Sequence, residues 1–137
     1  MVFVTRKERF NAAHKLWQPK WSEEKNREVF GKCANKNWHG HNFELFVTVK
    51  GEVDPDTGFV IDLKVLSDII KDRVVEQLDH LNINLDVPFM AGKMASTENL
   101  AMGIWDQLAD PIAEKGAQLH CIRLKETENN QVEYYGS

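Results

Sequence analysis

The sequence is poor in cysteine and has no long apolar run, and each shortage excludes a class of protein. Its 137 residues include only two cysteines, Cys33 and Cys121. At most one disulfide can form, so the chain is not a disulfide-stapled domain, and we expect free thiols. The apolar runs are only a few residues long, whereas a membrane-spanning helix needs about 20 apolar residues. We therefore expect no membrane segment.

The sequence also lacks an excess of positive charge and an export signal. Its 17 Lys and Arg residues are outnumbered by 21 Asp and Glu residues, and the formal net charge is -4. A general nucleic-acid-binding protein usually carries a basic stripe, so we expect no nucleic-acid partner. The N-terminus is charged early and has no apolar stretch of the kind that signal peptides contain. We therefore expect a cytoplasmic protein.

Length and apolar periodicity indicate one α+β domain over residues 1–137, since a single domain usually has about 100–200 residues. Four segments alternate as strands do: 2–16, 39–52, 119–126 and 131–135. Two segments carry apolar residues at helical spacing: 63–78, and a helix from Ser96 toward Pro111. The order ββααββ predicts an antiparallel four-stranded sheet with two helices on one face.

Polar segments between these elements carry turn and cap signals. Residues 17–32 are a polar insertion with two tryptophans, for which we expect a short helical turn in a loop or lid. The segment Asp54-Pro-Asp-Thr-Gly58 predicts a turn, because proline fixes φ and glycine accepts a positive φ. Asp62 and Ser96 are the expected N-caps of the two helices.

Three histidines could share one face of the predicted sheet. His39 and His41 are separated by one glycine, and strand residues two apart project from the same face. Pairing of the first two strands could bring His14 against them. Three imidazoles leave the fourth position of a tetrahedral zinc ion open, as catalytic sites do. Copper, iron and nickel also accept imidazole, and each histidine alone could be structural.

Four further residues could move protons or hold a ligand. Cys33 could act as a thiolate base beside a cation, serve as a fourth zinc ligand, or be a buried apolar residue. The adjacent Asp79 and His80 could form a pair in which the carboxylate orients the imidazole, although a polar helix end explains them equally well. Glu126 could grip an N–H pair of a flat heterocycle, or could be a solvated strand end.

Together, eight short motifs resemble the 6-pyruvoyl-tetrahydropterin synthase family, which includes the bacterial 6-carboxy-tetrahydropterin synthases. The resemblance covers nearly the whole chain and rests on the order and spacing of the motifs rather than on any one of them. The motifs are Phe10-Asn-Ala-Ala-His14, Phe30-Gly-Lys-Cys33, His39-Gly-His41-Asn, Asp54-Pro-Asp-Thr-Gly58, Leu78-Asp-His80, Leu85-Asp-Val-Pro88, Ser96-Thr-Glu-Asn99 and Lys125-Glu126-Thr.

The resemblance implies a tunnelling fold (T-fold) and an assembly. In this family, three subunits close a twelve-stranded barrel and two barrels stack, which gives a homohexamer built as a dimer of trimers. Sites in the family lie at subunit interfaces. This agrees with the sheet edges that a small four-stranded unit leaves open, since assembly into a ring could cover them.

Residue by residue, the resemblance also implies roles. The zinc ligands of the family match His14, His39 and His41, and its proton-transfer triad matches Cys33, Asp79 and His80. The acid that anchors the pterin ring matches Glu126, and further residues of the pterin pocket match Thr97 and Glu98.

The implied activity is a zinc-dependent lyase of tetrahydrobiopterin biosynthesis. It converts the small molecule 7,8-dihydroneopterin triphosphate into 6-pyruvoyl-tetrahydropterin with loss of triphosphate. The alternative is the 6-carboxy branch of queuosine biosynthesis, which uses the same substrate and also releases acetaldehyde. The five residues between Cys33 and His39 resemble the pyruvoyl-forming branch, since many carboxy-forming enzymes have three; Trp38 stands where many members have a small residue.

Two alternatives of other kinds stay open. One is a non-catalytic binding module stabilised by zinc, with Cys33 as the fourth ligand. The other is an enzyme of the same fold without zinc, similar to a dihydroneopterin aldolase.

Overall fold

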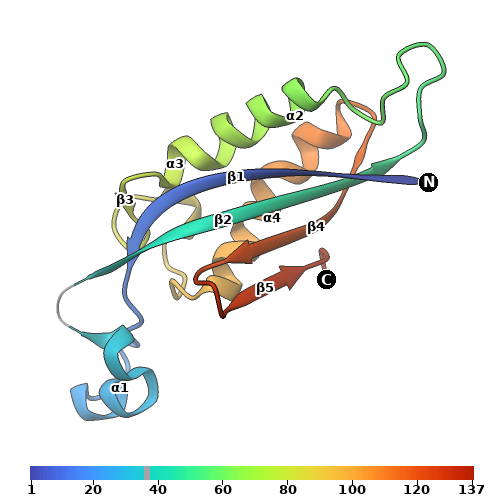
Figure 1. Ribbon diagram of the computed structural model, residues 1–137. Coiled ribbons are helices and arrows are strands. Elements are labelled where there is room, and N and C mark those ends of the chain that lie inside the picture. Colours follow the sequence, from blue (N-terminus) through green and yellow to red (C-terminus); the bar gives the residue numbers. More distant parts are fainter. Residues whose placement is uncertain (36–37) are drawn as a thin grey trace.

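One long antiparallel strand pair dominates the fold. The computed structural model describes residues 1–35 and 38–137. Strands β1 (Val2–His14) and β2 (His39–Gly51) are each 13 residues long and pair along their whole length, with Val2 opposite Gly51 and His14 opposite His39. Figure 1 shows them as the two longest arrows of the sheet. Both predicted strands are therefore confirmed, to within two residues at their ends.

The C-terminal strands extend this pair into a sheet. Strand β4 (Gln118–Lys125) is antiparallel to β2, and β5 (Gln131–Tyr134) is antiparallel to β4, so the predicted hairpin is present. In the described part of the chain the sheet has five strands in the order β3-β1-β2-β4-β5, which corrects the prediction of four. The extra strand, β3 (Leu81–Asn82), has two residues and is parallel to β1. Two residues are too few to show alternation in a sequence.

Two helical segments cover one face of the sheet (Figure 1). The first is continuous through α2 (Leu63–Ile70), a π-helical turn (Lys71–Val75) and α3 (Glu76–Leu78). The second is α4 (Thr97–Ala113). Both predicted caps are confirmed, because the Asp62 side chain accepts from the Lys64 N–H and the Ser96 hydroxyl accepts from the Asn99 N–H. Among the described residues, no helix has the length and apolarity that a bilayer crossing needs.

The core lies between the sheet and these helices. Alternate residues of the strands point into it, and each helical segment contributes one apolar stripe. The fully buried members with large side chains include Phe43, Leu45, Leu66, Ile70, Leu78, Leu100, Ile104, Leu108, Ile122 and Leu124. Apolar burial of this kind stabilises a domain without a disulfide or a structural metal.

The polar insertion forms an arm between β1 and β2, which Figure 1 shows projecting from one end of the sheet. It contains α1 (Glu23–Phe30) and a 3₁₀ turn (Gly31–Ala34), so the predicted helical turn is confirmed. Asn26 is 0% exposed and organises the arm. Its side chain accepts from the Gln18 N–H and donates to the Gln18 and Ser22 carbonyls.

The spacer between Cys33 and His39 belongs partly to this arm. Two of its five residues, 36 and 37, lie outside the described residues. The spacing that resembles the pyruvoyl-forming branch therefore stays a sequence observation.

Candidate metal centre

Cross-strand register brings three histidines together at the arm end of the sheet. His14 is directly opposite His39, and His41 is opposite Ala12, two residues along each strand. Directly opposite residues share a face, as do alternate residues of one strand. One ligand atom of each histidine lies within 4.8 Å of the other two. The three residues predicted as ligands thus form one group, which we call the histidine group.

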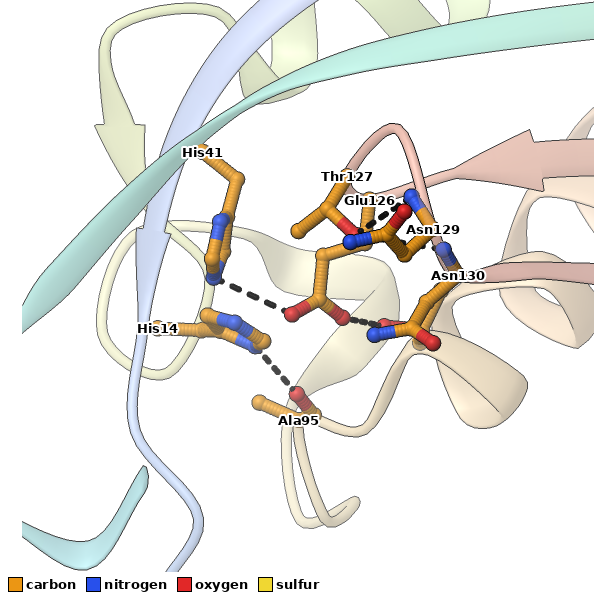
Figure 2. Close-up of polar contacts among 8 residues, drawn as sticks. His14, His41, Ala95, Glu126, Thr127, Asn129 and Asn130 are labelled. Atoms are coloured by element: carbon orange, nitrogen blue, oxygen red, sulfur yellow. Dashed lines mark hydrogen bonds and ion pairs between the residues drawn. The ribbon is translucent and has the colours of Figure 1, made fainter. Parts of the chain in front are cut away.

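Two nitrogens of the histidine group are free to bind a metal. His14 is only 3% exposed, and its Nδ1 lies 2.7 Å from the Ala95 carbonyl oxygen (Figure 2). Nδ1 therefore carries the proton, and Nε2 keeps its lone pair. His14 Nε2 and His41 Nε2 are buried and make no hydrogen bond to a described residue. Because buried polar atoms are nearly always paired, these two nitrogens fit a metal ion as their partner.

Burial also keeps two of the imidazoles neutral. Desolvation lowers the pKa of His39, and His14 lowers it further against the opposing effect of Glu126. Desolvation likewise lowers the pKa of His41, again against Glu126. Only a neutral imidazole can bind a metal. At neutral pH these side chains are therefore in the form that a metal requires.

The donor set leaves room for a fourth ligand. Within residues 1–35 and 38–137, the donor group contains the three histidines, and Cys33 is not part of it. Cys33 is a partly exposed free thiol in the 3₁₀ turn Gly31–Ala34. Three imidazoles with an open fourth position match a catalytic zinc site better than a closed structural one. The arrangement speaks against the module with Cys33 as fourth ligand.

Glu126 lies beside the histidine group. It follows the last residue of β4, and its Oε1 is 3.1 Å from His41 Nε2. The two atoms are close but lack hydrogen-bond geometry, and the contact is an ion pair only when His41 is protonated. Glu126 Oε2 accepts from the Thr97 hydroxyl at the start of α4. Figure 2 shows the Glu126 carboxylate pointing toward His41. Two of the predicted pterin-pocket residues thus meet at the metal centre.

The β4–β5 turn fixes the position of this carboxylate. The Glu126 N–H donates to the Asn130 carbonyl, and the Thr127 hydroxyl accepts from the Asn129 and Asn130 N–H groups (Figure 2). The third predicted pocket residue, Glu98, is exposed in the first turn of α4. No contact in the described part of the chain ties Glu98 to the histidine group.

Asp79 and His80 form the predicted pair, but not at the histidine group. His80 Nδ1 lies 2.9 Å from Asp79 Oδ2, and Asp79 Oδ1 accepts from the Asn11 N–H. The Asn11 N–H, and then the His80 imidazole, hold the pKa of the Asp79 carboxyl below its usual value. His80 has a φ of +61°, which is uncommon outside glycine, and its side chain is 83% exposed. Such an exposed, unusual conformation is a reason to suspect a functional role.

The Asp79–His80 pair borders a cleft of about 560 Å³, together with Asn11, Asn42 and Glu44. Asn11 lies between the buried Phe10 and Ala12. Its side chain therefore projects from the face opposite the core and the histidine group. The Asp79–His80 pair is thus bonded to the backbone edge of β1 and borders a cleft whose lining includes side chains from the face opposite the histidine group.

Two contacts of the site could not have been identified from residue types. The Ala95 carbonyl orients His14, and the Asn11 N–H holds Asp79. Both groups belong to the backbone, which every residue carries. No sequence pattern marks them, and only the folded chain shows them.

Comparison with known proteins identifies close relatives over the whole chain. The family "6-pyruvoyl tetrahydropterin synthase" matches residues 3–137. The 6-pyruvoyl tetrahydrobiopterin synthase of Pongo abelii is 43% identical over 133 residues, which is 97% of this chain and 90% of that protein. The solved structure of Caenorhabditis elegans 6-pyruvoyl tetrahydropterin synthase has a TM-score of 0.92 at 37% identity, covering 99% of this chain and 96% of that one.

A relative with a different name also matches. The dihydroneopterin monophosphate aldolase of Pyrococcus furiosus is 34% identical over 101 residues, which is 72% of this chain and 68% of that protein.

Proposed function

This chain belongs to the 6-pyruvoyl tetrahydropterin synthase family, and we propose that it is a zinc-dependent lyase that converts 7,8-dihydroneopterin triphosphate into 6-pyruvoyl-tetrahydropterin with loss of triphosphate. The observation that carries the proposal is the histidine group, with two free buried nitrogens beside Glu126 and Thr97. A metal held by the histidine group would bind vicinal hydroxyls, and the neighbouring Glu126 carboxylate would bind a flat heterocycle. The two together suit a substrate that carries both.

The proposed chemistry assigns a task to each residue. His14, His39 and His41 would hold the zinc ion, which would act as a Lewis acid toward the substrate side chain and make its C–H bonds more acidic. The Glu126 carboxylate accepts N–H groups of the pterin ring, and the Thr97 hydroxyl orients that carboxylate.

Proton transfer is assigned to Cys33 and to the Asp79–His80 pair. The Cys33 sulfur, as thiolate, removes a proton from a substrate carbon. His80 relays protons through Nε2, because Asp79 holds its Nδ1. A reducing cytoplasm would keep Cys33 available, and both cysteines of the chain are free thiols in the structure.

We further propose that the site is completed by a neighbouring subunit. In one subunit the Asp79–His80 pair opens to a cleft on the face opposite the histidine group, and a second copy would bring another Asp79–His80 pair to that group. In the described part of the chain, β5 pairs only with β4, and β1 pairs on its outer side with β3 at Ala12 and Ala13 alone. Open edges of this kind invite pairing between copies, and a ring of three, stacked in pairs, would close them.

The assembly is expected to be a homohexamer at assay concentrations. Light scattering coupled to gel filtration should give a mass close to six times the 15.8 kDa chain. A fully active protein with the mass of a single chain would contradict both the hexamer and the shared site.

Two alternative reactions can be distinguished from the main proposal. The 6-carboxy reaction uses the same substrate, and the Pongo abelii and Caenorhabditis elegans relatives, both named as 6-pyruvoyl synthases, favour the pyruvoyl product. An aldolase reaction is supported by the Pyrococcus furiosus relative, at lower identity and coverage. Two products separate these reactions. Triphosphate release from 7,8-dihydroneopterin triphosphate, rising in proportion to the zinc content of the protein, is expected for the pyruvoyl and 6-carboxy reactions, and acetaldehyde is expected for the 6-carboxy reaction and not for the pyruvoyl reaction. Folded, zinc-loaded protein that releases none would exclude the proposed function.

Changing Glu126 to glutamine should weaken substrate use without removing the metal. We expect kcat/KM to fall about 10- to 100-fold, because a hydrogen bond to a charged group contributes about 1.5–3 kcal/mol. The matched control is Glu128→Gln, an exposed acid in the same β4–β5 turn, which should keep wild-type kinetics. Equal kinetics for Glu126→Gln and the wild type would show that Glu126 is not the anchor.

A further inference from the structure

A lysine held between two indole rings joins the strand ends next to the metal ligands. Lys15 follows His14, the last residue of β1, and Trp38 precedes His39, the first residue of β2, so both adjoin the end of the paired strands. Lys15 Nζ lies 4.8 Å from the centroid of the Trp17 ring and 5.3 Å from that of the Trp38 ring. Both distances are within the range of a cation–π contact. We call Lys15, Trp17 and Trp38 the strand-end clasp.

Backbone hydrogen bonds connect the strand-end clasp to two other segments of the chain. The Lys15 N–H donates to Asn84 Oδ1, and Asn84 Nδ2 donates to the Lys15 carbonyl, each at 3.0 Å. The Leu16 N–H donates to the Cys33 carbonyl at 2.8 Å. The clasp is therefore anchored to the loop after β3 on one side and to the turn that carries Cys33 on the other.

Within the described residues, the arm that carries Cys33 has few other supports apart from Ala34 of the same turn, which is fully buried. Its buried Asn26 and the stacked Trp21 and Phe30 rings, 5.7 Å apart, hold the arm together internally. Helix α1 packs chiefly against the Gly31–Ala34 turn that follows it. The orientation of that turn relative to the sheet thus depends on the Leu16–Cys33 hydrogen bond, on the buried Ala34 and on the contacts around the clasp.

We propose that the strand-end clasp is a positioning device that fixes the Cys33 thiol relative to the histidine group. The inference rests on the proposed role of Cys33 as the base. Lys15 and Trp38 each adjoin a metal ligand in sequence, and Trp17 adjoins the residue that bonds the Cys33 carbonyl. Opening the clasp frees the Cys33 turn to shift while the register that aligns the histidines is kept by the 13 paired residues of each strand.

Disruption of the strand-end clasp is expected to lower kcat and to leave substrate binding nearly unchanged. A misplacement of a reacting group by about 1 Å can lower the rate about 100-fold. Glu126 and Thr97, which are proposed to bind the pterin, lie on β4 and α4 and not on the arm. Trp38→Ala and Lys15→Met should therefore lower kcat by about 10- to 100-fold with KM nearly unchanged.

The experiment measures kinetics and thiol reactivity together. Variants are made in a Cys121→Ser background, so that iodoacetamide reports on Cys33 alone. Trp38→Ala and Lys15→Met should alkylate faster than the parent, keep their metal, and unfold at a similar temperature. The conservative changes Lys15→Arg and Trp38→Phe retain a cation or an aromatic ring and should restore most of the loss.

Lys25→Met is the matched control. Lys25 Nζ lies 4.3 Å from the Trp21 ring centroid, so the change removes a contact of the same type on the arm without reaching the strand ends. It should leave kcat and alkylation at the parent level. The proposal is overturned if the clasp variants behave like the parent, if Lys25→Met loses as much activity as they do, or if the clasp variants lose metal. A parent protein without turnover would refute the proposed function, while the alkylation rates would still test the clasp.

Discussion

Replacement of Cys33 by alanine is expected to lower kcat by about 100- to 10,000-fold, the range that a general base contributes. Zinc content should stay at the wild-type level, because the metal donor group consists of three histidines and does not include this thiol. The measurements are steady-state kinetics with 7,8-dihydroneopterin triphosphate and metal analysis of the same preparation.

The control for this experiment is Cys121→Ala, which removes the other free thiol, buried on β4. Its kcat should stay near the wild-type value, even if the free energy of unfolding falls because a buried side chain is shortened. If Cys33→Ala loses zinc, Cys33 is a ligand and its role as base is wrong. If the variant keeps both zinc and full activity, the base must be sought elsewhere.

Removal of the metal is expected to abolish turnover and to leave the protein folded. A Lewis acid contributes several kcal/mol to transition-state stabilisation, which corresponds to a rate loss of about a thousandfold or more. The core lies between the sheet and helices α2 and α4 and is made of apolar side chains, so it does not depend on the histidine group. Circular dichroism and turnover should be followed through chelation and through zinc addition, which should restore activity.

Two histidine variants test whether the metal that supports turnover is bound by the histidine group. His39→Ala should lose zinc and activity together. His120→Ala removes a histidine that makes edge-to-face contacts with Phe3 and Tyr135, away from the histidine group, and should lose neither zinc nor activity. Unfolding on chelation would instead identify a structural site, in which metal affinity is folding free energy.

The elements of the fold were largely predictable, because each long one has a strong local signal. Alternation in β1 and β2, and helical spacing from Leu63 to Leu78, are properties of the sequence itself. The caps Asp62 and Ser96 were predictable for the same reason. The two-residue strand β3 was not, because its pairing with Ala12 and Ala13 is a tertiary contact.

The candidate site was predictable only where its residues are neighbours in sequence. His39 and His41 share a face by their spacing, and Asp79 and His80 are adjacent. The place of His14 depends on the register of two strands 13 residues long, which no short pattern specifies. The contact of Glu126 with His41 depends on the turn after β4. The separation of the Asp79–His80 pair from the histidine group depends on where α3 returns the chain to β1.

Identification of the product tests the central claim most directly. Zinc-loaded protein is incubated with 7,8-dihydroneopterin triphosphate, and the mixture is resolved by chromatography and mass spectrometry. The proposed function predicts equal amounts of triphosphate and 6-pyruvoyl-tetrahydropterin, in an amount that vanishes when the metal is removed. Acetaldehyde with 6-carboxy-tetrahydropterin would contradict the pyruvoyl reaction, and unchanged substrate in the presence of folded, zinc-loaded protein would contradict the catalytic site as a whole.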